Sequence, residues 1–323
     1  MTAVRKMRLR HLLLGACVVG AGGLAFAGTA LSSRQAGPAG LIVFHKEGPK
    51  YGDGQLFTVR PDGTGLRQIT HGPTSSVNAD WSPDGTTLAF SHYLPDSALV
   101  SMMNADGSNV RAVTPEGFQD APSFTPDGKA LVYTRDPNPS EDGIWMIATD
   151  GTGLRRLTAN PFIHNGECGC DGAAKVSPDG KTVAFVRVKR DNVTHALFSI
   201  GIDGTGLKPL LPYTLVVGSH LDWSPDGKRI AVTIGVNLAP GKSANVATVG
   251  PDGKNLRWVT RFKGGMRNAF VGGYSPDGKW LVIRIDQGAT HALYLVHPDG
   301  TALHRVYISR DIERGIDWGK GTT

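Results

Sequence analysis

The chain has 323 residues, of which 40% are hydrophobic and 19% charged, a composition typical of a globular protein with a sizeable core. Its 43 glycines and 20 prolines predict many short elements joined by tight turns rather than long helices. The formal net charge of +6 is concentrated in the first ten residues, and the remainder carries 30 basic against 28 acidic side chains. Nucleic-acid binding requires clustered basic charge, so this distribution excludes it.

Residues 1–30 have the pattern of an export segment. A basic start is followed by the apolar run Leu12–Ala27, which ends in the small-x-small pattern that signal peptidase accepts. Three alternatives remain open: a cleaved signal peptide, an uncleaved membrane anchor through residues 12–31, and a lipoprotein modified at Cys17. We therefore expect an exported protein, periplasmic or extracellular. Residues 31–40 are small and polar, which predicts a flexible linker.

Two short motifs alternate along the rest of the chain. The first is a large residue followed by Ser/Thr-Pro-Asp-Gly, and its five copies are Trp81–Gly85, Phe124–Gly128, Val176–Gly180, Trp223–Gly227 and Tyr274–Gly278. The second is Asp-Gly, a short spacer and an aliphatic residue, and its six copies begin at Asp62, Asp106, Asp150, Asp203, Asp252 and Asp299. A degenerate sixth copy of the first motif lies at Ile316–Gly319. Pro, Asp and Gly in this order favour a tight turn between two strands.

Each repeat predicts four short antiparallel strands in about 45 residues, the unit of a propeller blade. We therefore predict an all-β, six-bladed β-propeller over residues 41–323. The repeat starts in mid-blade with Leu41–Phe44 as a second strand and ends after Trp318. The N- and C-terminal segments should consequently pair within one blade and close the ring, which removes an open sheet edge.

The pattern of Ser-Pro-Asp-Gly followed by Asp-Gly-x-x-Leu-Arg-x-Leu-Thr resembles the propeller repeats of the TolB family. This resemblance implies a six-bladed periplasmic propeller, and TolB itself contacts a peptidoglycan-associated lipoprotein in the Tol–Pal system. The family has an α/β domain before the propeller, whereas only about ten linker residues separate the leader from the first predicted strand here. Similar repeats occur in prolyl-oligopeptidase-type peptidases, but this sequence has no G-x-S-x-G motif.

The loops that lead into the innermost strands should line one mouth of the channel. They supply a mixed polar set of candidate ligand-binding residues, namely Asn78, Gln119, Asp120, Asp171, His220, Asn268 and Arg314.

The loop from Asn160 to Ala174 lengthens one repeat and contains His164, Cys168 and Cys170. Three states of the two cysteines remain open: a disulfide with each other, free thiols, and thiolate ligands of zinc or copper.

We predict a monomeric, non-catalytic scaffold that binds an envelope protein or a cell-wall component. It needs no cofactor, and it contacts a membrane only through residues 12–31 if these stay uncleaved, as in a tethered sensor. The alternative is a metal-dependent lyase or hydrolase at the channel mouth, for which His164, Asp171 and His220 are the candidate metal ligands.

Overall fold

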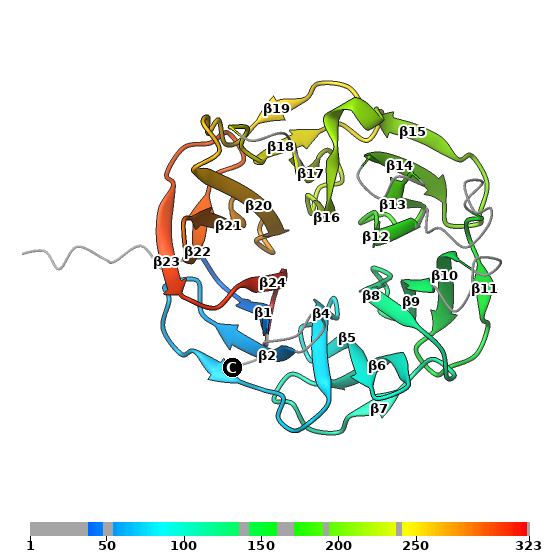
Figure 1. Cartoon of the computed structure of the whole chain (residues 1–323). Helices are drawn as coiled ribbons and strands as arrows, with labels where there is room; N and C mark the ends of the chain where they lie inside the picture. Colours follow the sequence, from blue (N-terminus) through cyan, green and yellow to red (C-terminus); the bar gives the residue numbers. More distant parts are fainter. Residues whose placement is uncertain are drawn as a thin grey trace, which may run out of the picture. The chain divides into compact units, whose positions relative to one another are not determined.

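The computed structural model describes residues 38–47, 54–135, 142–159, 171–189, 194–236 and 241–321. Within these ranges the chain forms six four-stranded antiparallel sheets arranged as blades around a central channel (Figure 1). The predicted six-bladed β-propeller is therefore confirmed. No helix among the described residues is long and apolar enough to cross a membrane. The predicted leader, including Cys17, and most of the linker lie outside the described residues.

The strands follow the chain from the channel outward in every blade except the first, whose innermost strand comes last in the sequence. The first blade contains β24 (Glu313–Gly319), β1 (Leu41–Glu47), β2 (Gly54–Val59) and β3 (Arg67–Gln68). The second and third contain β4 (Ser75–Trp81), β5 (Thr87–Leu94), β6 (Ser97–Asn104), β7 (Arg111–Ala112), β8 (Gln119–Phe124), β9 (Ala130–Arg135), β10 (Gly143–Ala148) and β11 (Arg155–Arg156). The fourth contains β12 (Asp171–Val176), β13 (Thr182–Val188), β14 (His195–Gly201) and β15 (Lys208–Leu211), followed by a short 3-10 helix at Tyr213–Leu215. The last two contain β16 (Val217–Trp223), β17 (Ile230–Ile234), β18 (Asn245–Val249), β19 (Arg257–Trp258), β20 (Arg267–Tyr274), β21 (Leu281–Gln287), β22 (Thr290–Val296) and β23 (His304–Ser309).

The repeated Ser-Pro-Asp-Gly segment forms the turn between the first and second strands of a blade. In the second blade the Ser82 hydroxyl donates to Asp84 Oδ1 at 2.6 Å, and the Gly85 N–H donates to the Ser82 carbonyl at 2.8 Å. Gly85 adopts a φ of 77°, a left-handed conformation that glycine reaches without steric cost. The motif is therefore explained by turn geometry.

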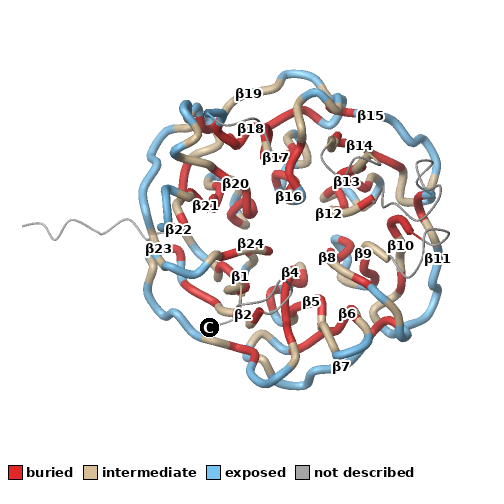
Figure 2. The backbone as a smooth tube through the Cα atoms, viewed as in Figure 1, coloured by how far each residue is buried: buried red, intermediate tan, exposed pale blue. Residues whose placement is uncertain are grey.

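The hydrophobic core lies between neighbouring blades. Trp81, which precedes the turn of the second blade, packs with Val43 and Leu56 of the first blade, and its exposed fraction is 5%. The corresponding Trp223 packs with Val186 of the preceding blade. Burial follows the inner strands, whereas the outermost strands are mainly exposed (Figure 2). The large residue before each turn thus joins adjacent blades.

The ring closes by pairing of the N-terminal and C-terminal segments, as the repeat phase predicts. Strand β24 pairs antiparallel with β1, with Ile42 opposite Trp318 and Leu41 opposite Gly319. The Trp318 indole N–H also donates to the Ala39 carbonyl at 3.1 Å. The closing blade therefore has the same four strands as the others.

Replacement of Gly319 by alanine should weaken this closure. An added Cβ would lie 2.3 Å from Cγ of Trp81, a core side chain with little room to move. We expect Gly319→Ala to lower the free energy of unfolding by about 1–3 kcal/mol, because overpacking a core forces its neighbours to shift. Gly172→Ala is the matched control, since its nearest neighbour would be Thr134 Oγ1 at 3.5 Å. Equal denaturant midpoints for the two variants would contradict the account of closure.

Candidate functional site: a polar cavity in the propeller channel

The innermost strands β4, β8, β12, β16, β20 and β24 face the central channel (Figure 1). A β-bulge interrupts the pairing of most of these strands with their neighbours, for example between Val77 and Asp80 in β4. Asn78, Ala121 and Ala173 occupy the same position of the bulge in three blades, with positive φ values of 51°, 49° and 52°. A bulge redirects side chains. This repeated position carries an amide side chain in one blade and a methyl group in two others.

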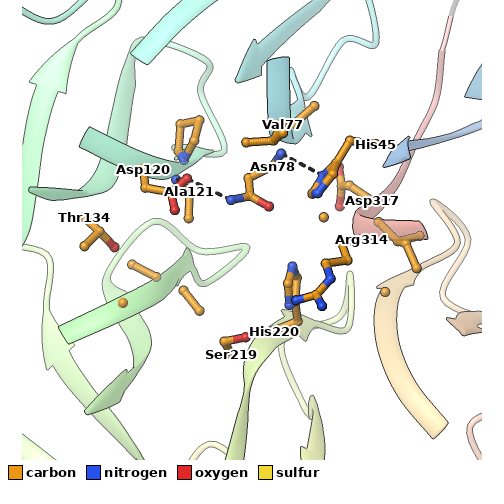
Figure 3. Close-up of a pocket in the computed structure, with 18 of the residues that line it drawn as sticks. His45, Val77, Asn78, Asp120, Ala121, Thr134, Ser219, His220, Arg314 and Asp317 are labelled. Carbon is orange, nitrogen blue, oxygen red and sulfur yellow. Dashed lines mark hydrogen bonds between the residues drawn. The ribbon is translucent and has the colours of Figure 1, made fainter. Parts of the chain in front are cut away.

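A cavity of about 250 Å³ lies within the channel and is lined by side chains from several blades (Figure 3). Its polar wall includes four predicted ligand-binding residues, Asn78, Asp120, His220 and Arg314. The structure adds His45, Glu47, Lys175 and Asp317 to this wall. The lining residues differ from blade to blade, so the cavity has no rotational symmetry.

Asn78 and Asp120 form one side of the cavity. The Asn78 amide donates to Asp120 Oδ1 at 2.8 Å, and the Ser91 hydroxyl donates to the same oxygen at 2.6 Å. The Ala121 N–H also donates to this oxygen, at 2.7 Å. These bonds fix the carboxylate in one orientation. The side chain would therefore lose less conformational entropy when a ligand binds.

Arg314 and Glu47 form an ion pair in another part of the wall. Arg314 Nε lies 2.8 Å from Glu47 Oε2, and the Arg314 side chain remains 42% exposed. The pair connects β24 with the end of β1. The remaining guanidinium surface is consequently open to solvent or to a ligand.

Two histidines in the cavity wall are neutral at physiological pH. Burial, with smaller contributions from His220, Arg314 and Arg284, lowers the pKa of His45 to about 3. Burial, together with the charges of Arg284, Lys175 and Arg314, lowers the pKa of His220 to about 4. The Asn78 N–H donates to His45 Nδ1 at 3.3 Å, which also requires an unprotonated nitrogen.

We expect the His220 imidazole to stay neutral between pH 8 and pH 5.5. Its Hε1 NMR resonance, assigned by its loss in His220→Gln, should not shift over this interval. A histidine in an unfolded peptide titrates near about 6.5. A His220 midpoint close to that value would contradict the environment described for the cavity.

Lys175 lines the cavity and is surrounded by three aspartates, Asp80, Asp222 and Asp317, which together with it are here called the Lys175 cluster. Its ammonium extends from β12 to Asp80 of β4, with which it forms a short hydrogen bond, and its Nζ lies 3.5 Å from Asp317 Oδ1 of β24. Strands β12 and β24 belong to blades on opposite sides of the ring, and β4 lies two blades from β12 (Figure 1). Burial raises the pKa of Asp80 to about 6 and that of Asp222 to about 7, against the opposing charge of Lys175. Although burial opposes it, the charges of Asp317, Asp80 and Asp222 raise the pKa of Lys175.

The same aspartates also connect neighbouring blades. Each accepts a hydrogen bond from the backbone N–H of the large residue in the next blade: Phe124 N to Asp80 Oδ2 at 2.8 Å, Tyr274 N to Asp222 Oδ2 at 2.7 Å and Trp81 N to Asp317 Oδ2 at 3.0 Å. The Lys175 cluster is therefore part of the framework of the ring as well as of the cavity.

The other three predicted ligand-binding residues do not line this cavity. Gln119 is 1% exposed and accepts a hydrogen bond from the Thr114 hydroxyl at 3.2 Å. Asp171 is fully buried and forms two 2.7 Å hydrogen bonds with Arg187. Asn268 accepts a hydrogen bond from the Ala244 N–H at 2.8 Å. Their polar groups stabilise the blades, a role that the sequence position alone does not reveal.

The predicted metal ligands are not brought together in the described part of the chain. His164, Cys168 and Cys170 lie outside it, and the carboxylate of Asp171 is engaged by Arg187. Across the described ranges, no group of three or more His, Cys, Asp or Glu side chains is arranged to hold a metal ion. The states of the two cysteines remain predictions.

Comparisons with known proteins agree with this architecture. The family model described as TolB beta propeller domain matches residues 38–168. A protein TolB homolog of Chlorobium luteolum is 28% identical over 151 residues, which cover 47% of this chain and 33% of the relative. Dipeptidyl-peptidase 5 of Porphyromonas endodontalis is 34% identical over 220 residues, covering 54% of this chain and 32% of the relative. This chain thus matches about a third of the length of both relatives.

The crystal structure of TolB from Acinetobacter baumannii has the same fold, with a TM-score of 0.67 at 19% identity, and the match covers 87% of this chain and 66% of that one. The six blades, their closure and the polar cavity define a β-propeller with a channel-centred pocket of mixed chemistry. Within that class, the repeats and the matched relatives are similar to TolB β-propellers.

Proposed function

We propose that this protein is an exported, non-catalytic binding protein whose channel cavity receives a segment of another envelope protein. The asymmetric polar wall carries the proposal: it presents an amide, carboxylates, neutral imidazoles and a guanidinium from different blades. Such a set suits a peptide, whose own groups differ along its length. Lys175 bridges the channel from β12 to Asp80 of β4 and Asp317 of β24, so a ligand in the cavity would meet these ion pairs rather than thread through the ring.

The relatives named for TolB support a binding role, whereas Dipeptidyl-peptidase 5 is named as a peptidase. One of them, from Nitratidesulfovibrio vulgaris, is named Tol-Pal system protein TolB and is 31% identical over 111 residues, which cover 34% of this chain and 24% of the relative. That name places the relative in a multi-protein system. The basic and apolar pattern of residues 1–30 supports export, as signal peptides require.

Affinity capture from the envelope fraction tests the proposal. Ser219 lines the cavity and is exposed, so Ser219→Trp should fill the mouth without breaking a buried contact. We expect the wild-type protein to retain a specific envelope protein with and without a chelator, and Ser219→Trp to lose it. Lys254→Trp, at an exposed turn outside the cavity, is the control and should bind like the wild type.

Equal capture by Ser219→Trp would place the binding surface elsewhere and contradict the proposal. Retention of a cell-wall glycan instead of a protein would change the partner class. Stoichiometric metal on a protein that captures no partner would favour the metal-dependent enzyme.

A further inference from the structure

A second cavity, of about 360 Å³, adjoins the first. The two share His220, Ser219 and Arg314 in their walls, so a molecule in the channel mouth has a neighbouring space to occupy. The second cavity, here called the side cavity, is bounded by residues of β14, β16, β17, β20, β21 and β24. It is distinct from the wall formed by Asn78 and Asp120.

Glu313 lines the side cavity, and its carboxylate forms no ion pair with a cation of the described structure. The residue is fully buried, and neither carboxylate oxygen has a hydrogen-bond partner of acceptable geometry in the described structure. Burial raises the pKa of this carboxyl, against smaller opposing effects of hydrogen bonding to its own backbone N–H and to the Ser309 hydroxyl and of the charges of Arg284 and His291. A buried acceptor without a partner is costly. The carboxylate is therefore available to a donor that enters from the cavity.

His195 provides a second acceptor in the same wall. Its Nδ1 lies 3.1 Å from the Val217 carbonyl, which can only accept, so Nδ1 carries the proton. Nε2 is consequently a lone-pair acceptor, and it is buried without a partner in the described structure. The Glu313 carboxylate and His195 Nε2 are thus both acceptors that a hydrogen-bond donor in the cavity would satisfy.

The charges around the side cavity leave one negative charge uncompensated. Arg284 is paired with Asp286, with Nε 2.9 Å from Oδ1, and Arg284 also donates to the Glu313 backbone carbonyl. Arg314 is paired with Glu47. No cation among the described residues forms an ion pair with the Glu313 carboxylate. A neutral hydroxyl could satisfy the hydrogen bonds but would leave this charge buried.

We propose that the side cavity is a subsite for one cationic nitrogen group, the ammonium or guanidinium of a lysine or arginine side chain, with Glu313 as its counter-ion. This inference rests on the proposed function, because the side chain would belong to the segment that enters the channel. Val236, Val271 and Ile312 line the same cavity and suit the aliphatic stem of such a side chain. His195 Nε2 accepts one of its remaining N–H groups.

Calorimetric titration of the full chain with n-butylammonium and n-butylguanidinium tests this subsite directly. We expect saturable one-to-one binding of either cation and much weaker binding of pentanamide, a neutral probe of similar length. Glu313→Gln should weaken cation binding by about tenfold or more, as expected for the loss of a charged hydrogen-bond partner. The same change at the exposed Glu116, Glu116→Gln, should leave the binding unchanged.

The fold of the variant provides a second readout. Glu313→Gln removes a buried charge that has no partner, so its thermal midpoint should equal or exceed that of the wild type. A lower midpoint would show that the fold itself satisfies the carboxylate, and would overturn the subsite. Equal cation binding by wild type and Glu313→Gln, or equal binding of pentanamide, would overturn it as well.

The two proposals fail separately. Capture of an envelope protein that Ser219→Trp abolishes, without any cation binding, would keep the proposed function and remove the subsite. Cation binding that depends on Glu313, without a captured partner, would keep the subsite and remove the proposed function.

Discussion

Lys175→Met should lower the free energy of unfolding by about 3 kcal/mol or more at pH 8. The substitution removes the ammonium that lies between Asp80 and Asp317 and near Asp222, and it leaves buried carboxylates without their cation. Breaking a buried ion pair by removing one partner typically costs about 3–5 kcal/mol. Denaturant unfolding followed by tryptophan fluorescence measures the loss.

The size of this loss should depend on pH. Burial already raises the pKa of Asp80 and Asp222 to about 6 and about 7, above the ordinary value of 3.8 in the unfolded chain. Without Lys175 the two carboxyl groups would ionise still less readily in the folded protein. The unfolded state of Lys175→Met then binds fewer protons than its folded state, so the stability of this variant rises as the pH falls toward 4. The gap between Lys175→Met and the wild type should therefore narrow in acid. Lys181→Met, at an exposed turn, is the control. If Lys175→Met and the wild type had the same free energy of unfolding at pH 8, the stabilising role of the Lys175 cluster would be refuted.

Arg187→Met should destabilise the protein by about 3–5 kcal/mol, because it removes the guanidinium that donates two hydrogen bonds to the buried Asp171 carboxylate. Asp171 and Arg187 face each other across β12 and β13, and their side chains are 0% and 4% exposed. The double variant Asp171→Asn/Arg187→Met should recover part of the loss, since no charge then remains buried.

The exposed pair Lys228–Asp226 provides the comparison. Its side chains are 80% and 55% exposed, with Nζ 3.7 Å from Oδ2. Lys228→Met should change the stability by less than about 0.5 kcal/mol, as surface ion pairs contribute little. A small effect of Arg187→Met, comparable to that of Lys228→Met, would return Asp171 to the set of candidate ligand-binding residues.

The blades could be predicted because each repeat encodes its own turn. The Ser82 hydroxyl, the Asp84 carboxylate and the left-handed Gly85 are local features that recur with the motif, and the phase of the repeat fixed the pairing of β1 with β24. The cavity was only partly predictable. Asn78 and Asp120 were expected at the channel mouth, but their mutual hydrogen bond depends on the bulges of β4 and β8.

The other cavity residues were not predicted from the sequence, and the reasons are physical. His45 and Glu47 lie on β1, which is the second strand of its blade and not the innermost one, and they reach the cavity beside β24, with which β1 pairs. Lys175 does occupy a repeated position, immediately before the large residue of its blade, where Asp80 and Asp317 stand in others. Opposite charges at one repeated position were a signal for contact across the channel. Conversely, nothing local distinguishes the buried Asp171 from an exposed loop residue until Arg187 is placed beside it.

Site-specific photo-crosslinking from Ser219 is the most direct test of a partner in the channel cavity. A photoreactive side chain at Ser219, irradiated in intact envelope, should give a covalent adduct with one envelope protein, and the same group at Lys254 should not. Adducts from Lys254 with none from Ser219, under conditions where both proteins are folded, would contradict binding in the cavity.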